Sequence, residues 1–156
     1  MGTDVYLEWD GMTKEEEEKQ ITGFSINAGR YGYLRVGIRM INENIALREI
    51  FDEKYWKGTY RYKFTEEDFK RVCQIILGYL ISEIFGIELP KDETIKQMNK
   101  MHEALLNAFK NLGYKVVINS KDISFVICWA NSVLEFYKLG LQKEKEGKNP
   151  RVSISW

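Results

Sequence analysis

Both ends of the chain alternate apolar and polar side chains with the period of a β-strand, and this feature constrains the fold most. Near the N-terminus Val5, Leu7 and Trp9 alternate with more polar neighbours, and residues 151–156 repeat the pattern. A period of two places alternate side chains on one face of a sheet, so each end predicts a strand with one buried face. Chain ends fray unless they are tied down. We therefore expect both ends to join one sheet.

Two further segments in the first half have the same period. Residues 59–64 alternate aromatic and basic side chains, which predicts a strand. Residues 33–40 place apolar side chains at every even position, which also predicts a strand. A helix is the alternative for this second segment, because apolar residues recur there at helical spacing as well: Leu34, Ile38, Ile41 and Ile45.

The second half of the chain has helical periodicity. Thr65 followed by Asp68 has the spacing of a helix cap with an acid in the first turn, and apolar residues then recur every three or four positions for about twenty residues. Two more helices are expected, one at about 92–112 and one from about residue 120 into the lysine-rich stretch 143–148.

Length and composition agree with a single domain. A chain of 156 residues that is 44% hydrophobic falls within the usual size of one domain and can bury a core without disulfides or metal. The sequence contains no internal repeat and no linker rich in proline, glycine or serine. We expect one α+β domain over residues 1–156, in which a small, largely antiparallel sheet, with strands at both termini and in the first half, packs on three long helices.

The charge is balanced overall but not along the chain. There are 23 basic and 23 acidic residues, yet residues 1–27 carry seven acids against two bases and residues 28–63 carry eight bases against four acids. A neutral chain lacks bulk attraction for nucleic acid or an anionic membrane, so such binding would need a local patch. No apolar run predicts a membrane span, and the first ten residues lack the pattern of a signal peptide. We expect a cytoplasmic protein without a membrane partner.

The cysteines and the single histidine indicate core positions. Cys73 and Cys128 lie within apolar helical patterns, so we expect both to be reduced core residues and poor nucleophiles. His102 lies beside the inward stripe of the second predicted helix. A buried, hydrogen-bonded histidine and a general base are both open interpretations, although catalysis would also need an orienting partner and a nucleophile.

Aromatic rings alternate with cations between residues 54 and 63 and again between residues 30 and 39. Single-stranded nucleic acid needs both, since bases stack on rings and cations neutralise phosphates. The cations would share one face if the strands at 33–40 and 59–64 were neighbours, whereas an ordinary solvated sheet face is the alternative. The sequence motif of RNA-binding sheets, with its glycines and phenylalanines in a fixed order, is absent. The candidate nucleic-acid-binding residues are Arg30, Arg35, Arg39, Trp56, Tyr60, Arg61 and Lys63.

A glycine-rich segment at residues 27–32 has two interpretations. Its backbone amides could meet an anion, as in other anion-binding loops. It matches neither the phosphate-binding loop nor the dinucleotide fingerprint. Turn glycines with positive φ explain the same residues without a ligand.

Three carboxylates near the N-terminus suggest a metal. Asp4 and Glu8 fall on one face of the first predicted strand, with Asp10 in the turn beyond it. Convergent carboxylates can hold Mg²⁺ or Mn²⁺ in a hydrolase. Simple alternation on a half-exposed strand explains the same pattern. No cofactor is expected, apart from Mg or Mn under this hydrolase alternative.

The aromatic content favours an interaction surface. Tryptophan and tyrosine are enriched at protein interfaces, and a homodimer through the sheet edge or the helical layer agrees with this. Because no catalytic constellation is evident, the leading interpretation is a non-enzymatic interaction or structural module with a protein partner or self-association. Single-stranded nucleic-acid binding and a metal-dependent hydrolase are the alternatives. The candidate interface aromatics are Tyr6, Trp9, Trp56, Trp129, Tyr137 and Trp156.

Overall fold

A four-stranded antiparallel sheet organises the computed structural model, which describes residues 2–22, 28–84 and 123–156. The strand order is β2-β1-β4-β3, and β1 lies between β2 and β4. Both ends of the chain therefore join one sheet, as the two terminal patterns predict, and the first and last strands pair directly, with Leu7 opposite Val152. The strands are β1 (Gly2–Glu8), β2 (Tyr33–Gly37), β3 (Tyr60–Arg61) and β4 (Arg151–Ser155).

The alternation of side chains gives the sheet one buried and one half-exposed face. Val5 and Leu7 on β1 and Val152 on β4 are fully buried, whereas Asp4 and Tyr6 between them are only half-buried. Burying an aliphatic side chain of this size contributes about 1.5 to 3 kcal/mol, so the apolar alternation is what holds the two ends of the chain together.

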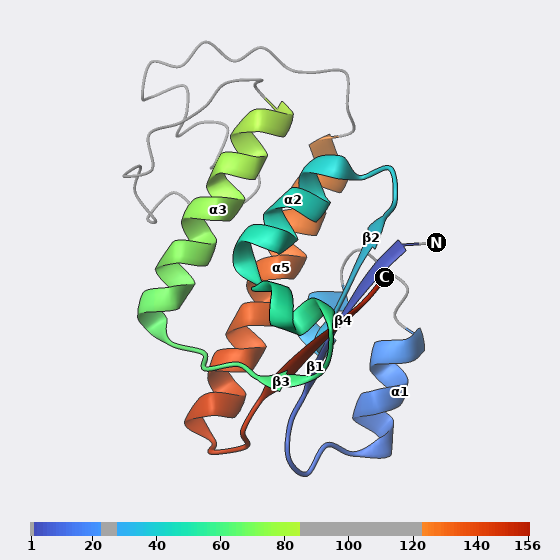
Figure 1. Ribbon diagram of the computed structural model, residues 1–156, viewed down its shortest axis with the longest axis vertical. Helices are drawn as coiled ribbons and strands as arrows, with labels where there is room; N and C mark the ends of the chain where they lie inside the picture. Colours follow the sequence, from blue (N-terminus) through green and yellow to red (C-terminus); the bar gives the residue numbers. More distant parts are fainter. Residues whose placement is uncertain (1, 23–27, 85–122) are drawn as a thin grey trace.

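Helices cover the buried face. Figure 1 shows α2, α3 and α5 gathered on one side of the strands, with α1 on the other side in that view. Side chains from these three helices and from the sheet form one apolar core, which includes Leu47, Ile76 and Val133. The described α-helices are α1 (Lys14–Thr22), α2 (Ile41–Ile50), α3 (Glu66–Ile84) and α5 (Ile123–Lys145). Two short 3₁₀ turns are η1 (Ala28–Tyr31) and η2 (Glu53–Trp56).

The start of α3 confirms the predicted helix cap. The backbone amide of Asp68 donates a hydrogen bond to the Thr65 hydroxyl oxygen at 3.0 Å. This bond satisfies one of the amides that a helix leaves unpaired in its first turn. The helix expected at about 92–112 and His102 lie outside the described residues. The α+β fold class with an antiparallel sheet is confirmed.

The strand predicted at 33–40 is confirmed as far as Gly37, whereas the alternative helix through Leu34 and Ile38 is wrong. The strand ends at Gly37, and α2 begins at Ile41 after a tight turn in which the amide of Met40 donates to the carbonyl of Gly37 at 3.0 Å. The Asn44 side-chain amide donates to the carbonyls of Gly37 and Met40 at 3.2 and 2.9 Å. Asn44, in the first turn of α2, therefore stabilises the loop between β2 and this helix.

Within the described ranges, no helix combines the length and the apolar composition that a membrane crossing requires.

Candidate functional site

The strands expected to form a nucleic-acid surface lie apart. In the sheet order, β2 and β3 occupy opposite edges and are separated by β1 and β4. The condition for a shared basic face, that these two strands be neighbours, is not met, because β1 and β4 lie between them. The shared basic face that the prediction needed is not formed.

Several of the seven predicted nucleic-acid residues already have partners in the protein. Arg35 forms an ion pair with Asp4 at 3.5 Å, and Arg61 forms one with Glu144 on α5. Trp56 is buried and donates its indole N–H to the carbonyl of Phe51. A ring in this position does not offer a free stacking platform.

The other four of the seven are dispersed. Arg30 lies over the ring of Tyr31 at 4.8 Å, and Arg39 is exposed in the turn before α2. Tyr60 and Lys63 are exposed near the opposite sheet edge. Nucleic-acid binding stays a prediction, without the common face on which it was based.

The three N-terminal carboxylates do not converge. Asp4 accepts a hydrogen bond from the Tyr33 hydroxyl at 2.5 Å, and Glu8 stands opposite Arg151 in the sheet. Asp10 accepts hydrogen bonds from other side chains, and these hold the pKa of Asp10 below its usual range; the donors are Asn149 and Arg151. Within the described part of the chain, no group of three or more acids, histidines or cysteines is placed to hold a metal ion. The expected cluster is therefore not formed, because Asp4 is bound to Tyr33 on β2, whereas Asp10 is bound to residues next to and on β4.

The glycine-rich loop uses its backbone internally. The amide of Gly29 donates to the Ser132 hydroxyl on α5 at 2.8 Å, and the amide of Gly32 donates to the carbonyl of Gly29 at 2.9 Å. Gly32 has a φ of +82°, as expected for a turn glycine. These two amides are thus committed within the fold and do not form an anion-binding loop.

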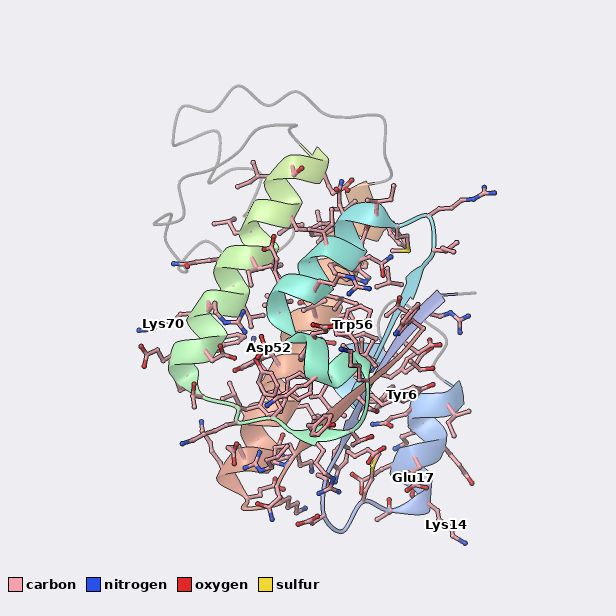
Figure 2. All side chains as sticks on the ribbon, in the orientation of Figure 1. Tyr6, Lys14, Glu17, Asp52, Trp56 and Lys70 are labelled. Carbon is pink, nitrogen blue, oxygen red and sulfur yellow. The ribbon has the colours of Figure 1, made fainter. Side chains whose placement is uncertain are left out.

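Most of the aromatic side chains proposed for an interface belong to the core. Trp9, Trp56, Trp129 and Tyr137 are buried, and Tyr6 is half-buried on the outer sheet face. Trp156 is the exception, with 79% of its surface exposed. The Trp156 indole N–H donates to the carbonyl of the buried Trp56 at 3.3 Å, and Figure 2 labels Tyr6 and Trp56 among the side chains near the strands.

The α2 face is the site that sequence reasoning missed. It consists of the exposed side chains that follow β2, namely Ile38, Arg39, Ile41, Ile45 and Arg48. The three isoleucines are 66%, 67% and 50% exposed. Ile41, Ile45 and Arg48 recur at i, i+4 and i+7, which places them on one stripe of the helix. The helical spacing was visible in the sequence, but it does not tell which side of a helix faces the core.

The opposite side of α2 is fixed to the protein by polar as well as apolar contacts. Glu43 is buried and accepts a hydrogen bond from the Tyr79 hydroxyl on α3 at 2.7 Å. Asn42 donates to Glu83 on α3 at 2.5 Å, and Thr3 on β1 donates to Asn44 at 3.0 Å. With an acid turned inward, the helix has little freedom to rotate its isoleucines into the core. The α2 face is therefore held outward in a defined position.

The charges of the α2 face are cationic. From residue 38 to residue 48 the exposed charged side chains are Arg39 and Arg48, and the exposed acid Glu49 follows Ile45 at i+4, at the edge of the same stripe. The Arg48 guanidinium lies 4.1 Å from the centre of the Trp56 ring, which holds it beside the end of the helix. The face thus presents three aliphatic side chains and two arginines, with Ile41 and Ile45 between Arg39 and Arg48 along the chain.

A second polar cluster joins α3 and α5. The Asp68 carboxylate accepts hydrogen bonds from the Tyr62 and Tyr137 hydroxyls, both at 2.5 Å, and from the Arg71 guanidinium at 2.7 Å. Burial raises the pKa of Asp68, but these three hydrogen bonds outweigh it and hold the pKa below its usual value. Both oxygens are therefore occupied, and the arrangement ties the elements together instead of presenting a reactive group.

A shallow groove of about 470 Å³ lies nearby, between the start of α3 and the end of α5. Phe69 and Leu141 give it an apolar lining, and Lys145 forms an ion pair with Glu66 at 3.2 Å across it. Its charged walls are thus partly neutralised, and it lacks the group of convergent titratable side chains that marks an active site.

Comparisons of the chain with protein-family models, with curated protein sequences and with solved structures each find no match.

Proposed function

We propose that this chain is a non-enzymatic interaction protein that binds an acidic amphipathic helix through the α2 face. The observation that carries the proposal is the exposure of Ile38, Ile41 and Ile45 together with the arginines Arg39 and Arg48. When most apolar side chains of a protein are buried, an apolar patch that stays exposed on its surface marks an interaction site. A partner helix would cover the isoleucines with its apolar side and place acids against the arginines, as in helix-in-groove recognition.

The magnitudes favour a reversible contact. Complete burial of one isoleucine contributes about 1.5 to 3 kcal/mol, so covering the exposed part of all three contributes about 4 kcal/mol. Association costs at least about 4 kcal/mol in lost translational and rotational freedom. Apolar burial alone therefore roughly balances that cost, and ion pairs with the partner supply the remaining stabilisation. We expect a weak complex that salt weakens further.

The polar contacts of α2 also support the proposal. Because Glu43 and Asn44 fix the helix to α3 and β1, the α2 face does not have to be ordered when the partner binds. A surface that is already in place avoids part of the entropy cost of binding.

A designed peptide tests the proposal. The probe is a fluorescein-labelled helical peptide with leucines along one side and glutamates around the rest, and binding is measured by fluorescence anisotropy. We expect weak binding of the acidic peptide that decreases as salt is added, because apolar burial and the cost of association nearly cancel. A peptide with lysines in place of the glutamates should not bind.

Two variants locate the binding site. Ile45→Glu places an acid in the middle of the α2 face and should abolish binding of the acidic peptide. Gln74→Glu makes the same charge change on the exposed surface of α3 and serves as the control. Equal binding of the acidic and basic peptides, or full binding by the Ile45→Glu protein, would contradict the proposal.

A further inference from the structure

The chain carries an acidic helix of its own that complements the α2 face. Residues 15–18 of α1 are all glutamates, and the exposed surface of this helix also includes Ile21, which is 60% exposed. The side of α1 that faces the protein is mainly polar, since its buried residue is Gln20. Figure 2 shows Lys14 projecting from the start of α1, with Glu17 one turn further along. The outer side of α1 therefore combines Ile21 with several acids and with two exposed lysines, Lys14 and Lys19, of which Lys19 pairs with Glu15.

From this complementarity we infer that α1 of a second copy of this chain docks on the α2 face. The inference rests on the proposed function, because it names the acidic helix that the α2 face binds. The charge asymmetry of the sequence agrees with it, since the first 27 residues are net acidic and residues 28–63 are net basic. Opposite charges on two separate surfaces of one molecule attract copies of that molecule to each other.

The spacing of the two helices fits this contact. Glu17 and Ile21 lie one helical turn apart on α1, and Ile41 and Ile45 lie one turn apart on α2. When Ile21 sits between Ile41 and Ile45, Glu17 comes within about one turn of an arginine in either helix direction. That arginine is Arg39 if the helices run parallel and Arg48 if they run antiparallel.

The symmetry of such a contact has a consequence for assembly. α1 and the α2 face are different surfaces, so the contact is head-to-tail and leaves one free surface of each kind on the pair. Head-to-tail contacts continue into rings or open chains, unlike a two-fold contact that stops at a dimer. The average mass in solution should therefore rise with concentration beyond that of a dimer.

The experiment measures mass by sedimentation velocity at protein concentrations from about 10 to about 500 µM, a range that brackets a weak association. Ile45→Glu removes the α2 face as an acceptor, and Ile21→Arg removes α1 as its partner. Both side chains are exposed, and circular dichroism checks that each variant is folded. Gln74→Glu is again the control. An equimolar mixture of the two variants then retains one complementary pair of surfaces.

The expected result has three parts. The wild-type protein and the Gln74→Glu protein associate, each of the two interface variants alone stays monomeric, and their mixture forms a heterodimer and nothing larger. A monomeric wild-type protein over the whole range, or association that survives Ile21→Arg, would overturn the inference. If the wild-type protein stays monomeric but the acidic peptide still binds, the inference is wrong and the proposed function stands. If neither associates, both are wrong.

Discussion

The backbone amide of Gly29 in η1 donates a hydrogen bond to the hydroxyl oxygen of Ser132 on α5 at 2.8 Å, across 103 residues of sequence. A Cβ added at residue 29 would overlap the Ser132 carbonyl oxygen, which is backbone and has no rotamer to change. Glycine at this position thus permits the segment before β2 to lie directly against the longest described helix.

Gly29→Ala should therefore reduce the free energy of unfolding by about 2 to 3 kcal/mol, because an inserted methyl group that meets fixed backbone forces the two elements apart. Urea unfolding followed by tryptophan fluorescence measures the loss. Gly78→Ala is the matched control, since Gly78 lies within α3 and a Cβ there meets nothing within 4 Å. That substitution should stabilise the protein by about 0.5 to 1 kcal/mol. Equal stability of the Gly29→Ala and wild-type proteins would show that the close approach is absent.

Asp68 gives a second stability prediction. Asp68→Asn removes the charge that pairs with Arg71 and one strong acceptor for the hydroxyls of Tyr62 and Tyr137. We expect a loss of about 2 kcal/mol, within the range for hydrogen bonds to a charged group. Glu67→Gln, at the exposed neighbouring position of α3, is the control and should change stability by less than about 0.5 kcal/mol.

The same residue predicts how stability depends on pH. Since the pKa of Asp68 is lower in the folded protein than the value near 3.9 of an unfolded chain, its stabilising contribution is complete above that value. The contribution is lost as the pH falls through the folded-state pKa. The free energy of unfolding should therefore fall more steeply below about pH 4 in the wild-type protein than in Asp68→Asn. Parallel pH profiles for the two proteins would contradict this assignment.

The alternation of side chains was enough to predict the strands of the sheet. The sequence pattern did not predict which side of α2 faces the core. Val5, Leu7 and Val152 are buried at every second position, and a strand allows only two faces. On α2 the buried side combines Glu43, which accepts a hydrogen bond from Tyr79, with Ala46, Leu47 and Ile50, while Ile41 and Ile45 face outward. Isoleucine lies on both sides of this helix, so a rule that places acids outside and isoleucines inside does not settle its orientation. The partner that allows Glu43 to be buried is Tyr79, which lies 36 residues away in the sequence. No pattern in the residues around Glu43 indicates this contact.

The positions of the basic residues could not be predicted from the sequence for a related reason. Arg35 and Arg61 would share one face only if β2 and β3 were neighbours, but β1 and β4 separate them. Their actual partners, Asp4 and Glu144, come from different elements. Periodicity identifies elements and faces, and it does not reveal which strand enters the sheet between two others.

The two thiols should differ in reactivity. Cys73 is buried, and this burial raises the pKa of its thiol to about 11, whereas Cys128 is half-exposed on α5. Because the thiolate is the reactive form, Cys73 should react with a disulfide reagent at pH 8 only after unfolding. We expect one fast thiol in the native protein and two in denaturant. The fast reaction should persist in Cys73→Ser and vanish in Cys128→Ser; the opposite pattern would exchange the two assignments.

The attachment of α1 gives the last prediction. The side-chain amide of Gln20 donates to the carbonyls of Leu7 at 2.8 Å and Gly32 at 3.3 Å, and it is buried. Gln20→Ala leaves the Leu7 carbonyl without this donor, so we expect a loss of about 1 to 2 kcal/mol. Hydrogen exchange of the α1 amides should accelerate more than that of the α3 amides, because the loss is local.

Lys19→Ala is the control for this prediction. Lys19 is exposed on the same helix and pairs with Glu15 at 3.3 Å, an interaction worth less than about 1 kcal/mol at a surface. Since α1 must be in place to present Ile21, Gln20→Ala should also weaken self-association, whereas Lys19→Ala should preserve it or strengthen it by making α1 more acidic. Uniform acceleration of exchange across α1 and α3 would instead mean that Gln20 contributes to global stability and not to the attachment of this helix.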